Sequence, residues 1–188
     1  MDNDDEEEEI ILTNDNIKDF VRRYYELGAS HMPGDLRWKD IGDWDVSQVT
    51  DMSQLFYFCF LGEWKKDMFS NIGKWDVSNV TNMSEMFCRS NFTCPLENWD
   101  VSNVTNMSRM FCLSGFNHPI GGWDVSRVTN MSEMFKNATY FNQPLGKWNV
   151  SNITNTNNMF QGASQFNQSH HLNGSGGMDL VRRLKHKK

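Results

Sequence analysis

The sequence predicts a repeat solenoid of about five short coils. Residues 123–147 read WDVSRVTNMSEMFKNATYFNQPLGK, and the same pattern begins at Trp44, Trp75, Trp99 and, in a degenerate copy, at Trp148. Together with Trp123, these tryptophans lie 31, 24, 24 and 25 residues apart, and self-similarity at such a period is typical of a solenoid. One copy buries too little apolar surface to offset the entropy of ordering it, so we expect the copies to stack.

The composition is that of a soluble globular chain. Apolar residues make up 38%, charged residues 22%, and the net charge is −6, which argues against nucleic acid as a partner. No run of about 18 apolar residues is present, so we expect no membrane span. The chain begins MDNDDEEEE, unlike a secretory signal, and no cysteine is placed as a lipid anchor. We therefore expect an intracellular location.

Four segments are predicted along the chain. They are an acidic disordered tail at 1–12, a capping helix with its connector at 13–40, the repeats at 41–168, and a flexible linker with a basic tail at 169–188. The basic tail could engage nucleic acid or an anionic membrane. A solvated terminus, or contact with the acidic N-terminal tail, explains the same residues and is the favoured interpretation.

The predicted helix covers residues 15–27. Asn14 or Asp15 is the expected N-cap, and Gly28 is the expected stop. The apolar residues recur at helical spacing on one face: Ile17, Phe20, Val21, Tyr24 and Leu27. We expect this face to shield the open end of the solenoid. Binding of a peptide or a membrane surface is the alternative use of the same face.

The aligned copies predict a short strand, a polar turn and a single helical turn in each coil. An apolar residue precedes each tryptophan by three positions and a valine follows it by two, which matches the strand segment of a leucine-rich repeat. Such a strand would bury Trp and Val and turn the Asp between them outward. Ser84, Ser108 and Ser132 are the expected caps of the helical turn. An Asn column should form a ladder that bonds the turn backbones: Asp51, Asn82, Asn106, Asn130 and Asn155.

Two repeats depart from the common pattern. The first has about seven extra residues between Phe56 and Trp75, and insertions of this kind in solenoids often lie on the binding face. The insertion contains aromatic residues beside two lysines. In the last repeat, Thr156 replaces a methionine and Asn157 replaces the expected serine cap, which fits an end coil that faces solvent.

The motif WDVSNVTNMSEMF, followed in a later copy by FNQPLGKW, resembles the BspA-like leucine-rich repeat, a mycoplasma-type surface-protein repeat of formerly unknown function. The resemblance covers residues 41–168. It implies a leucine-rich-repeat-like solenoid of coils of 24–25 residues, and it implies binding to proteins or cell surfaces. It also implies a surface or virion location as the alternative to an intracellular one.

The outward aspartates form a column that allows two interpretations. Its members are Asp45, Asp76, Asp100, Asp124 and then Asn149. Carboxylates about 4.8 Å apart repel each other by roughly 1 kcal/mol in water, so they must be hydrated, hydrogen-bonded or bridged by cations. Calcium would be the bridging ion. Because each coil offers a single carboxylate and no calcium-loop spacing is present, hydrogen-bonded structural aspartates are favoured, and we expect no metal.

No other residue pattern predicts catalysis or a cofactor. The two methionine columns suggest core packing rather than a copper site. Cys88 and Cys112 share a column and could approach closely enough for a disulfide, although reduced thiols are the simpler interpretation. The five histidines do not recur with the repeat, and no hydrolase, phosphate-loop or zinc motif is present. We expect no enzymatic activity, no cofactor and no small-molecule substrate.

The sequence therefore predicts a non-enzymatic protein–protein interaction scaffold with a protein partner of unknown identity and an unspecified oligomeric state. A structural role in a virion or cell-surface assembly, or cation-dependent adhesion, is the alternative. Exposed aromatic and charged side chains on a rigid scaffold are where binding energy concentrates. The candidate contacts are Tyr57, Phe58, Trp64, Lys74, Asp76, Asp100, Asn103, Asp124, Arg127 and Lys147.

Overall fold

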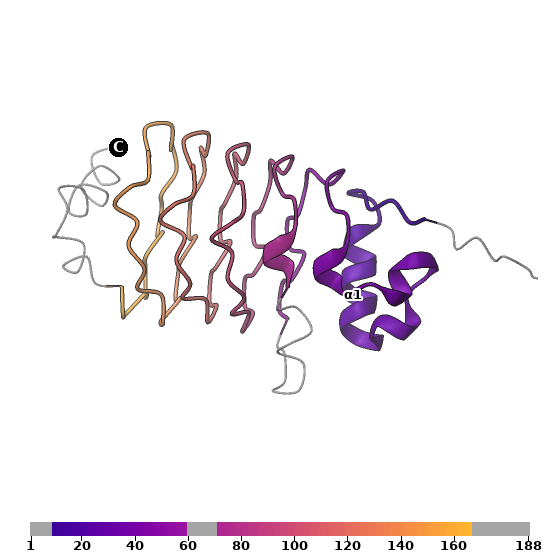
Figure 1. The fold of residues 1–188 in the computed structure, drawn as a ribbon. Helices are drawn as coiled ribbons and strands as arrows, with labels where there is room; N and C mark the ends of the chain where they lie inside the picture. The colour runs from indigo at the N-terminus through magenta and orange to yellow at the C-terminus, as the bar shows by residue number, and fades with distance from the viewer. Residues whose placement is uncertain (1–8, 60–70, 167–188) are drawn as a thin grey trace, which may run out of the picture.

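The fold is a stack of repeats with a helical segment at its N-terminal end (Figure 1). The computed structural model describes residues 9–59 and 71–166. The acidic start, most of the insertion with Trp64, and the basic tail lie outside the described residues. One α-helix is present among them, α1 (Ile17–Leu27). Four short 3-10 helices accompany it in the described part: η1 (Ala29–His31), η2 (Gly34–Trp38), η3 (Ile41–Asp43) and η5 (Ile72–Lys74).

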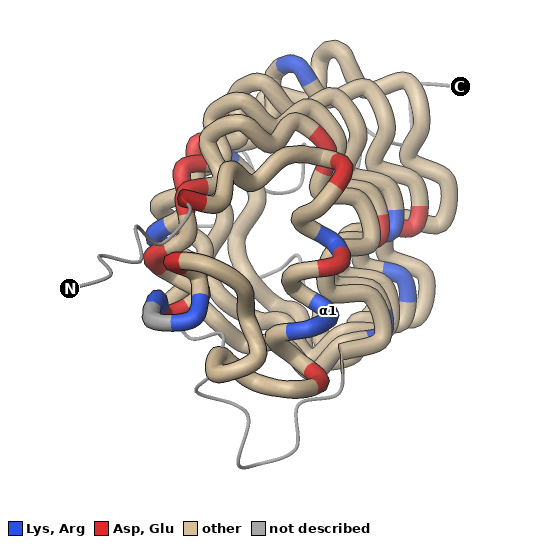
Figure 2. Tube along the Cα trace, turned by 90° about the vertical axis from the view of Figure 1, so that its right-hand side faces the viewer, with Lys and Arg blue, Asp and Glu red and all other residues tan. Residues whose placement is uncertain are grey.

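We number the repeats from the apolar residue that precedes each tryptophan. Repeats 1 to 5 span 41–71, 72–95, 96–119, 120–144 and 145–166. Isolated parallel bridges join neighbouring repeats at one position each: Asp51 to Asn82, Asn82 to Asn106, Asn106 to Asn130, and Asn130 to Asn155. Viewed nearly along the stack, the repeats lie behind one another in register (Figure 2).

The predicted leucine-rich-repeat class is wrong. Within 9–59 and 71–166, the repeats contain no strand longer than a single bridge and no α-helical turn. The extended segment at each tryptophan is connected to its neighbours mainly through side chains. The indole Nε1 of Trp99, for example, donates to the carbonyl of Ile72 at 3.0 Å. A continuous backbone ladder, which a strand requires, is therefore not formed there.

The predicted single helical turns are replaced by a different backbone. In repeat 2, Glu85 and Arg89 have φ of 57°, in the left-handed region. The N–H groups of alternate residues donate to the next repeat, so that Met83 bonds to Asn106 and Glu85 to Ser108 at 2.9 Å each. The N–H groups of Met86 and Cys88 donate three residues back along the chain. This alternation satisfies the backbone without helix or strand.

Asparagine, not serine, caps the turn that follows each bridge. The Oδ1 atom of Asn106 accepts the N–H of Ser108 at 3.0 Å, and equivalent bonds occur at Asp51, Asn82, Asn130 and Asn155. At the same level, the N–H groups of Thr105 and Asn106 both donate to the carbonyl of Thr81 in the previous repeat. The expected Asn ladder is confirmed, whereas the expected serine caps are wrong because these serines donate their N–H groups instead.

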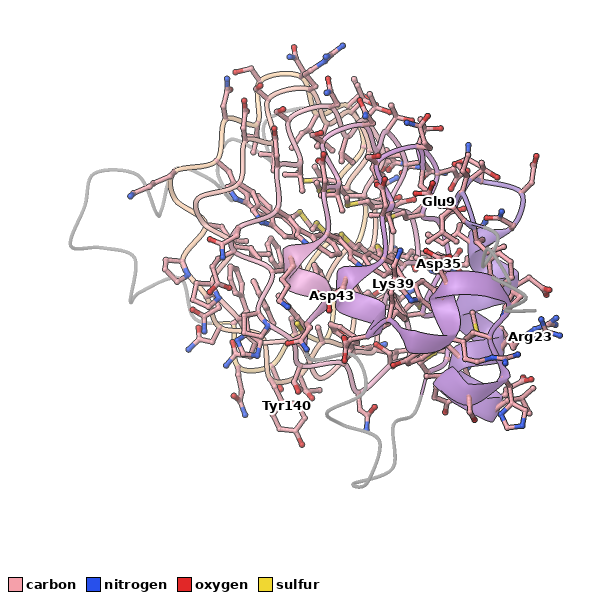
Figure 3. All side chains as sticks on the ribbon, turned by 45° about the vertical axis from the view of Figure 1, so that its right-hand side comes forward. Glu9, Arg23, Asp35, Lys39, Asp43 and Tyr140 are labelled. Carbon is pink, nitrogen blue, oxygen red and sulfur yellow. The ribbon has the colours of Figure 1, made fainter. Side chains whose placement is uncertain are left out.

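The core is built from stacked columns of identical side chains. One Phe ring per repeat stacks on the next at 5.4–5.7 Å with interplanar angles of 1–12°: Phe56, Phe87, Phe111, Phe135 and Phe160. The methionine columns are buried, and sulfur atoms line the interior of the repeats (Figure 3). Core packing of the methionines is confirmed. Gly73 and Gly121 allow close approach, since an added Cβ would lie 2.5 and 2.4 Å from the carbonyl oxygens of Pro95 and Pro144, the residues that lead into the following repeat.

Helix α1 covers the N-terminal end of the stack and joins the same core. Ile17, Val21 and Tyr24 are buried, and the N–H of Gly28 at the helix end donates to Tyr24. The predicted helix and its stop are confirmed. Leu27, however, is 53% exposed, so it does not belong to the buried face. The first helical turn is preceded by Asn16 rather than by Asn14 or Asp15.

Asn14 was predicted to cap the helix, but its side chain binds the backbone of repeat 1 instead. Its Oδ1 accepts the N–H groups of Thr50 and Asp51 at 2.9 and 3.0 Å. In every later repeat, the equivalent two N–H groups donate to a threonine carbonyl of the preceding repeat. The amide of Asn14 therefore substitutes for the carbonyl of a missing preceding repeat. Trp44, whose indole nitrogen finds no acceptor among the described residues, packs edge-on against Tyr24 of α1 instead.

We predict that Asn14→Ala lowers the free energy of unfolding by about 1 kcal/mol, because two backbone donors lose their acceptor. Asn14→Asp keeps an oxygen in the same place and is the matched control, with a smaller change expected. Urea unfolding of the two variants measures the difference. Equal losses in both would contradict the role of the oxygen as a substitute carbonyl.

We predict a larger loss for Asn106→Ala, about 1 to 2 kcal/mol, since its half-buried side chain caps a turn between two repeats. Asn155→Ala is the control, because there the capped N–H belongs to the exposed Asn157 and water can replace the side chain. Thermal or urea unfolding compares them. A loss for Asn155→Ala as large as that for Asn106→Ala would contradict the capping argument.

Candidate interaction surface

The aspartate column lies on the outside of the repeats and closes a turn in each. Each Oδ1 accepts the N–H of the serine two residues later, at 2.9–3.0 Å for Asp45, Asp76, Asp100 and Asp124. Asn149 makes the equivalent bond to Ser151 at 3.2 Å. The serine hydroxyl and its N–H hold the pKa of Asp45, Asp76 and Asp124 below the ordinary value.

These bonds support the hydrogen-bonded interpretation of the column. No cluster of three or more potential metal ligands is found in the part of the chain that the structure describes. The three predicted contacts Asp76, Asp100 and Asp124 are exposed, so their second carboxylate oxygens face solvent while the first oxygens serve the turns.

Three further predicted contacts bind other residues of the chain. The side-chain N–H of Asn103 donates to the carbonyl of Ser78 at 2.7 Å, and its oxygen accepts from Arg127 at 2.6 Å. The side chains of Asn79 and Asn152 make the same hydrogen bond to the preceding repeat, so this column links neighbouring repeats. Arg127 takes the place of an asparagine in that column. Lys74 pairs with Asp43 at 3.1 Å, although both side chains are exposed.

The aromatic pair Tyr57 and Phe58 is the clearest exposed apolar feature among the predicted contacts. Tyr57 is 39% exposed and Phe58 is 56% exposed, and the two ring centroids lie 6.4 Å apart. Lys147 is exposed on repeat 5, far from them along the stack. Trp64 lies outside the described residues. The predicted contacts therefore do not form one cluster among the described residues, and charged positions occur on several sides of the repeats (Figure 2).

A row of exposed side chains runs from Phe58 across the neighbouring repeats. We call it the variable row, and it consists of Phe58, Arg89, Leu113 and Asn137. All four residues have positive φ, and each N–H donates to the next repeat at 2.7–2.9 Å, which holds the row rigidly. Sequence reasoning missed Arg89 and Leu113 as surface candidates. The signal was available, since this column changes from repeat to repeat while the residue two positions earlier is always Phe.

Tyr140 was also missed. It is 59% exposed on repeat 4 and points away from the stack (Figure 3). It stands directly before the buried Phe141, and the equivalent residues in the earlier repeats are Gly115 and Asn91. Its position in a column of small or polar residues indicated exposure.

Behind the variable row lies a pair of stacked thiols. Cys88 and Cys112 are 0% and 2% exposed, and both are free. The Cys88 thiol donates to the Cys112 sulfur, which lowers the pKa of Cys112 to about 6 and raises that of Cys88. Arg109 also donates to Cys112 and pairs with Glu85 at 3.0 Å. Burial closes the two thiols to solvent, so they belong to the scaffold, and the reduced-thiol interpretation is confirmed.

The comparisons place the repeats in a known group. The family described as "Mycoplasma protein of unknown function, DUF285" matches residues 29–113 and 58–173. The chain belongs to this family. No curated protein and no solved structure matches the chain. Among the described residues, no helix is long and apolar enough to cross a membrane.

For this member of the family, we predict that replacing Asp45, Asp76 and Asp124 together by asparagine preserves stability at pH 7, because Asn149 already closes the same turn with an amide. The folded pKa of each aspartate is depressed, so its contribution is present above the unfolded pKa of about 3.9 and is lost as pH falls through the folded value.

The triple variant should therefore show a shallower fall in unfolding free energy between about pH 5 and pH 3. Urea titrations at a series of pH values measure the slope. Because other depressed carboxyls remain, such as Asp35, the slope decreases and does not vanish. An unchanged slope would contradict the assignment.

Proposed function

We propose that this chain is a non-catalytic module that binds a protein partner through Tyr57, Phe58 and the adjoining variable row. The supporting observation is the exposure of two neighbouring aromatic rings on a backbone that is fixed by bonds to the next repeat. Large exposed aromatics on a rigid scaffold provide apolar contact area at small entropic cost. Arg89 and Leu113 extend the surface with a cation and an apolar side chain.

The remaining predicted contacts belong to the proposal as polar contacts away from the aromatic pair. Asp76, Asp100, Asp124, Lys74, Arg127 and Lys147 are exposed, and Asn103 is partly so. Exposed charges outside the core of an interface affect the association rate and selectivity more than the affinity. The contribution of Trp64 rests on the sequence alone.

The resemblance to BspA-like repeats adds support for binding to proteins or cell surfaces. It also favours the alternative proposals, namely a structural component of a virion or cell-surface assembly, or a cation-dependent adhesin. We propose the interaction module first because its candidate surface does not require an ion. The hydrogen-bonded aspartates weaken the cation-dependent alternative without excluding it.

We predict that Tyr57→Ala combined with Phe58→Ala weakens partner binding about tenfold or more, because hot-spot aromatics contribute about 1 to 2 kcal/mol or more each. The full-length chain is immobilised, partners from the native source are recovered, and the affinity of each purified partner is measured for both chains. Tyr140→Ala, which removes an equally exposed ring elsewhere, is the control.

Both rings of the pair are exposed, so the double variant should unfold at nearly the wild-type temperature. Undiminished affinity would contradict the proposed surface. Binding that disappears on chelation of calcium, in wild type and variants alike, would favour the adhesin instead.

A further inference from the structure

The two ends of the stack differ in whether described residues cover them. At the N-terminal end, α1 covers repeat 1, and Asn14 accepts the N–H groups of Thr50 and Asp51. At the opposite end, repeat 5 is the last described repeat, drawn in gold in Figure 1. No described residue covers its outer side.

Repeat 5 presents a row of backbone donors. In repeat 4, the N–H groups of alternate residues donate to the carbonyls of repeat 5 at 2.7–2.9 Å, the four donors being Met131, Glu133, Phe135 and Asn137. The equivalent N–H groups of repeat 5 find no acceptor among the described residues. We call them the donor row, and they belong to Thr156, Asn158, Phe160 and Gly162.

The end also offers one acceptor. The carbonyl of Thr129 in repeat 4 accepts two N–H groups of repeat 5, those of Thr154 and Asn155. The carbonyl of Thr154 is its equivalent at the end of the stack and receives no N–H group from the described residues. The end therefore has the hydrogen-bonding pattern that each repeat shows to its successor.

Repeat 5 differs from the other repeats in charge. From Trp148 to Phe166 it contains no Asp, Glu, Lys or Arg, whereas each earlier repeat contains both signs of charge. A solvent-exposed surface ordinarily carries such residues, and interface cores are depleted of them because charges are costly to desolvate. The absence of charge from Trp148 to Phe166, beyond the exposed Lys147 at the start of the repeat, favours a covered surface.

Two aromatic rings complete the end. Phe160 and Phe166 lie parallel with centroids 4.2 Å apart, and both are only partly buried. Inner members of the Phe column, such as Phe111, are stacked on both sides. Phe160 is stacked on Phe135 of repeat 4 and on Phe166 of its own repeat, but no described ring lies beyond it in the Phe column, where an apolar side chain of a further repeat would lie.

We infer that this end binds an extended segment of a partner protein, which adds to the stack as a further repeat would. The partial positive charges of the donor row require backbone carbonyls, and the rings require an apolar side chain, so the segment is a polypeptide with few charges. The inference rests on the proposed interaction function and assigns it a second surface.

A second copy of the chain does not fit this end. Two copies related by a twofold axis would set one donor row against the other, which leaves both rows without acceptors. A head-to-tail arrangement is blocked because α1 and Asn14 already cover the N-terminal end. The arrangement of backbone donors thus favours a polypeptide other than a second copy of this chain.

The test uses the full chain with random peptides displayed on phage as the probe. Peptides are selected on the wild type and measured against Phe166→Asp, which charges the aromatic surface, and Asn157→Lys, which adds a charge at an exposed residue without removing packing. Tyr140→Asp is the matched control on the side of repeat 4. Amide hydrogen exchange, resolved by residue, is recorded with and without the selected peptide.

We expect slowed exchange at Thr156, Asn158, Phe160 and Gly162 on peptide binding, and about tenfold or greater loss of affinity in both end variants but not in the control. Asn157→Lys keeps the test valid if Phe166→Asp is poorly folded. Failure to select any peptide that prefers the wild type over the end variants overturns the inference.

Three other outcomes would also overturn the inference. The first is protection of the four amides in the free chain, which would show that residues 167–188 cover the end. The second is a dimer that Phe166→Asp abolishes, which would show that a second copy covers the end. The third is that the peptides bind without protecting the four amides and lose affinity for the variant that combines Tyr57→Ala with Phe58→Ala. This last result refutes the end site and leaves the proposed function intact.

Discussion

Hydrogen bonds between each repeat and its successor, the same at every junction, are the constraint on which the structure depends. Each repeat donates alternate N–H groups to its successor and offers a threonine carbonyl to the successor's turn. The tryptophan indoles and the side chains of Asn79, Asn103 and Asn152 donate back to the preceding repeat. In an isolated repeat, these hydrogen-bond donors and acceptors would have no partners. The same bonds fix the register in which the Phe and Met columns meet.

This bonding also explains the unusual backbone. Among residues 9–59 and 71–166, nine residues other than glycine have positive φ, and they recur at the same two positions of the repeat. Each such residue costs roughly 1 kcal/mol when isolated. The cost is offset because the alternating conformation aims successive N–H groups at the next repeat. The variable row inherits its rigidity from this arrangement, so its side chains are displayed on fixed backbone even though no strand or helix supports them.

The sequence predicted the structure correctly at positions where every repeat carries the same type of side chain. Burial of Trp, Val, Met and Phe and the ladder formed by the Asn column followed from the spacing, because these side chains are specific to their positions, whereas the capping role was assigned to the serines and belongs to Asn. The backbone class was not accessible in this way. The left-handed positions are occupied by Gln, Glu, Arg, Phe, Leu and Asn, and no shared property of these residues indicates that conformation. The bonds between repeats impose it, and local propensity does not.

The candidate surface was only partly predictable for a related reason. Exposed Tyr57 and Phe58 stood out as aromatics where the pattern changes, but Arg89 and Leu113 were hidden inside an otherwise regular motif. Asn103 was taken for a contact, yet its amide serves the preceding repeat. An outward position in a repeat is therefore weak evidence of function until the neighbour's hydrogen bonds are known.

The identical bonding at every junction has a consequence for how such a chain can change in length. Every internal junction joins the same donors to the same acceptors, so duplication or loss of one whole repeat leaves each remaining junction with its partners. Only the two ends are unlike the rest, and at the first of them a single asparagine side chain stands in for a neighbour. Repeat number is free to vary by duplication, whereas residues near Asn14 must be retained for the stack to begin.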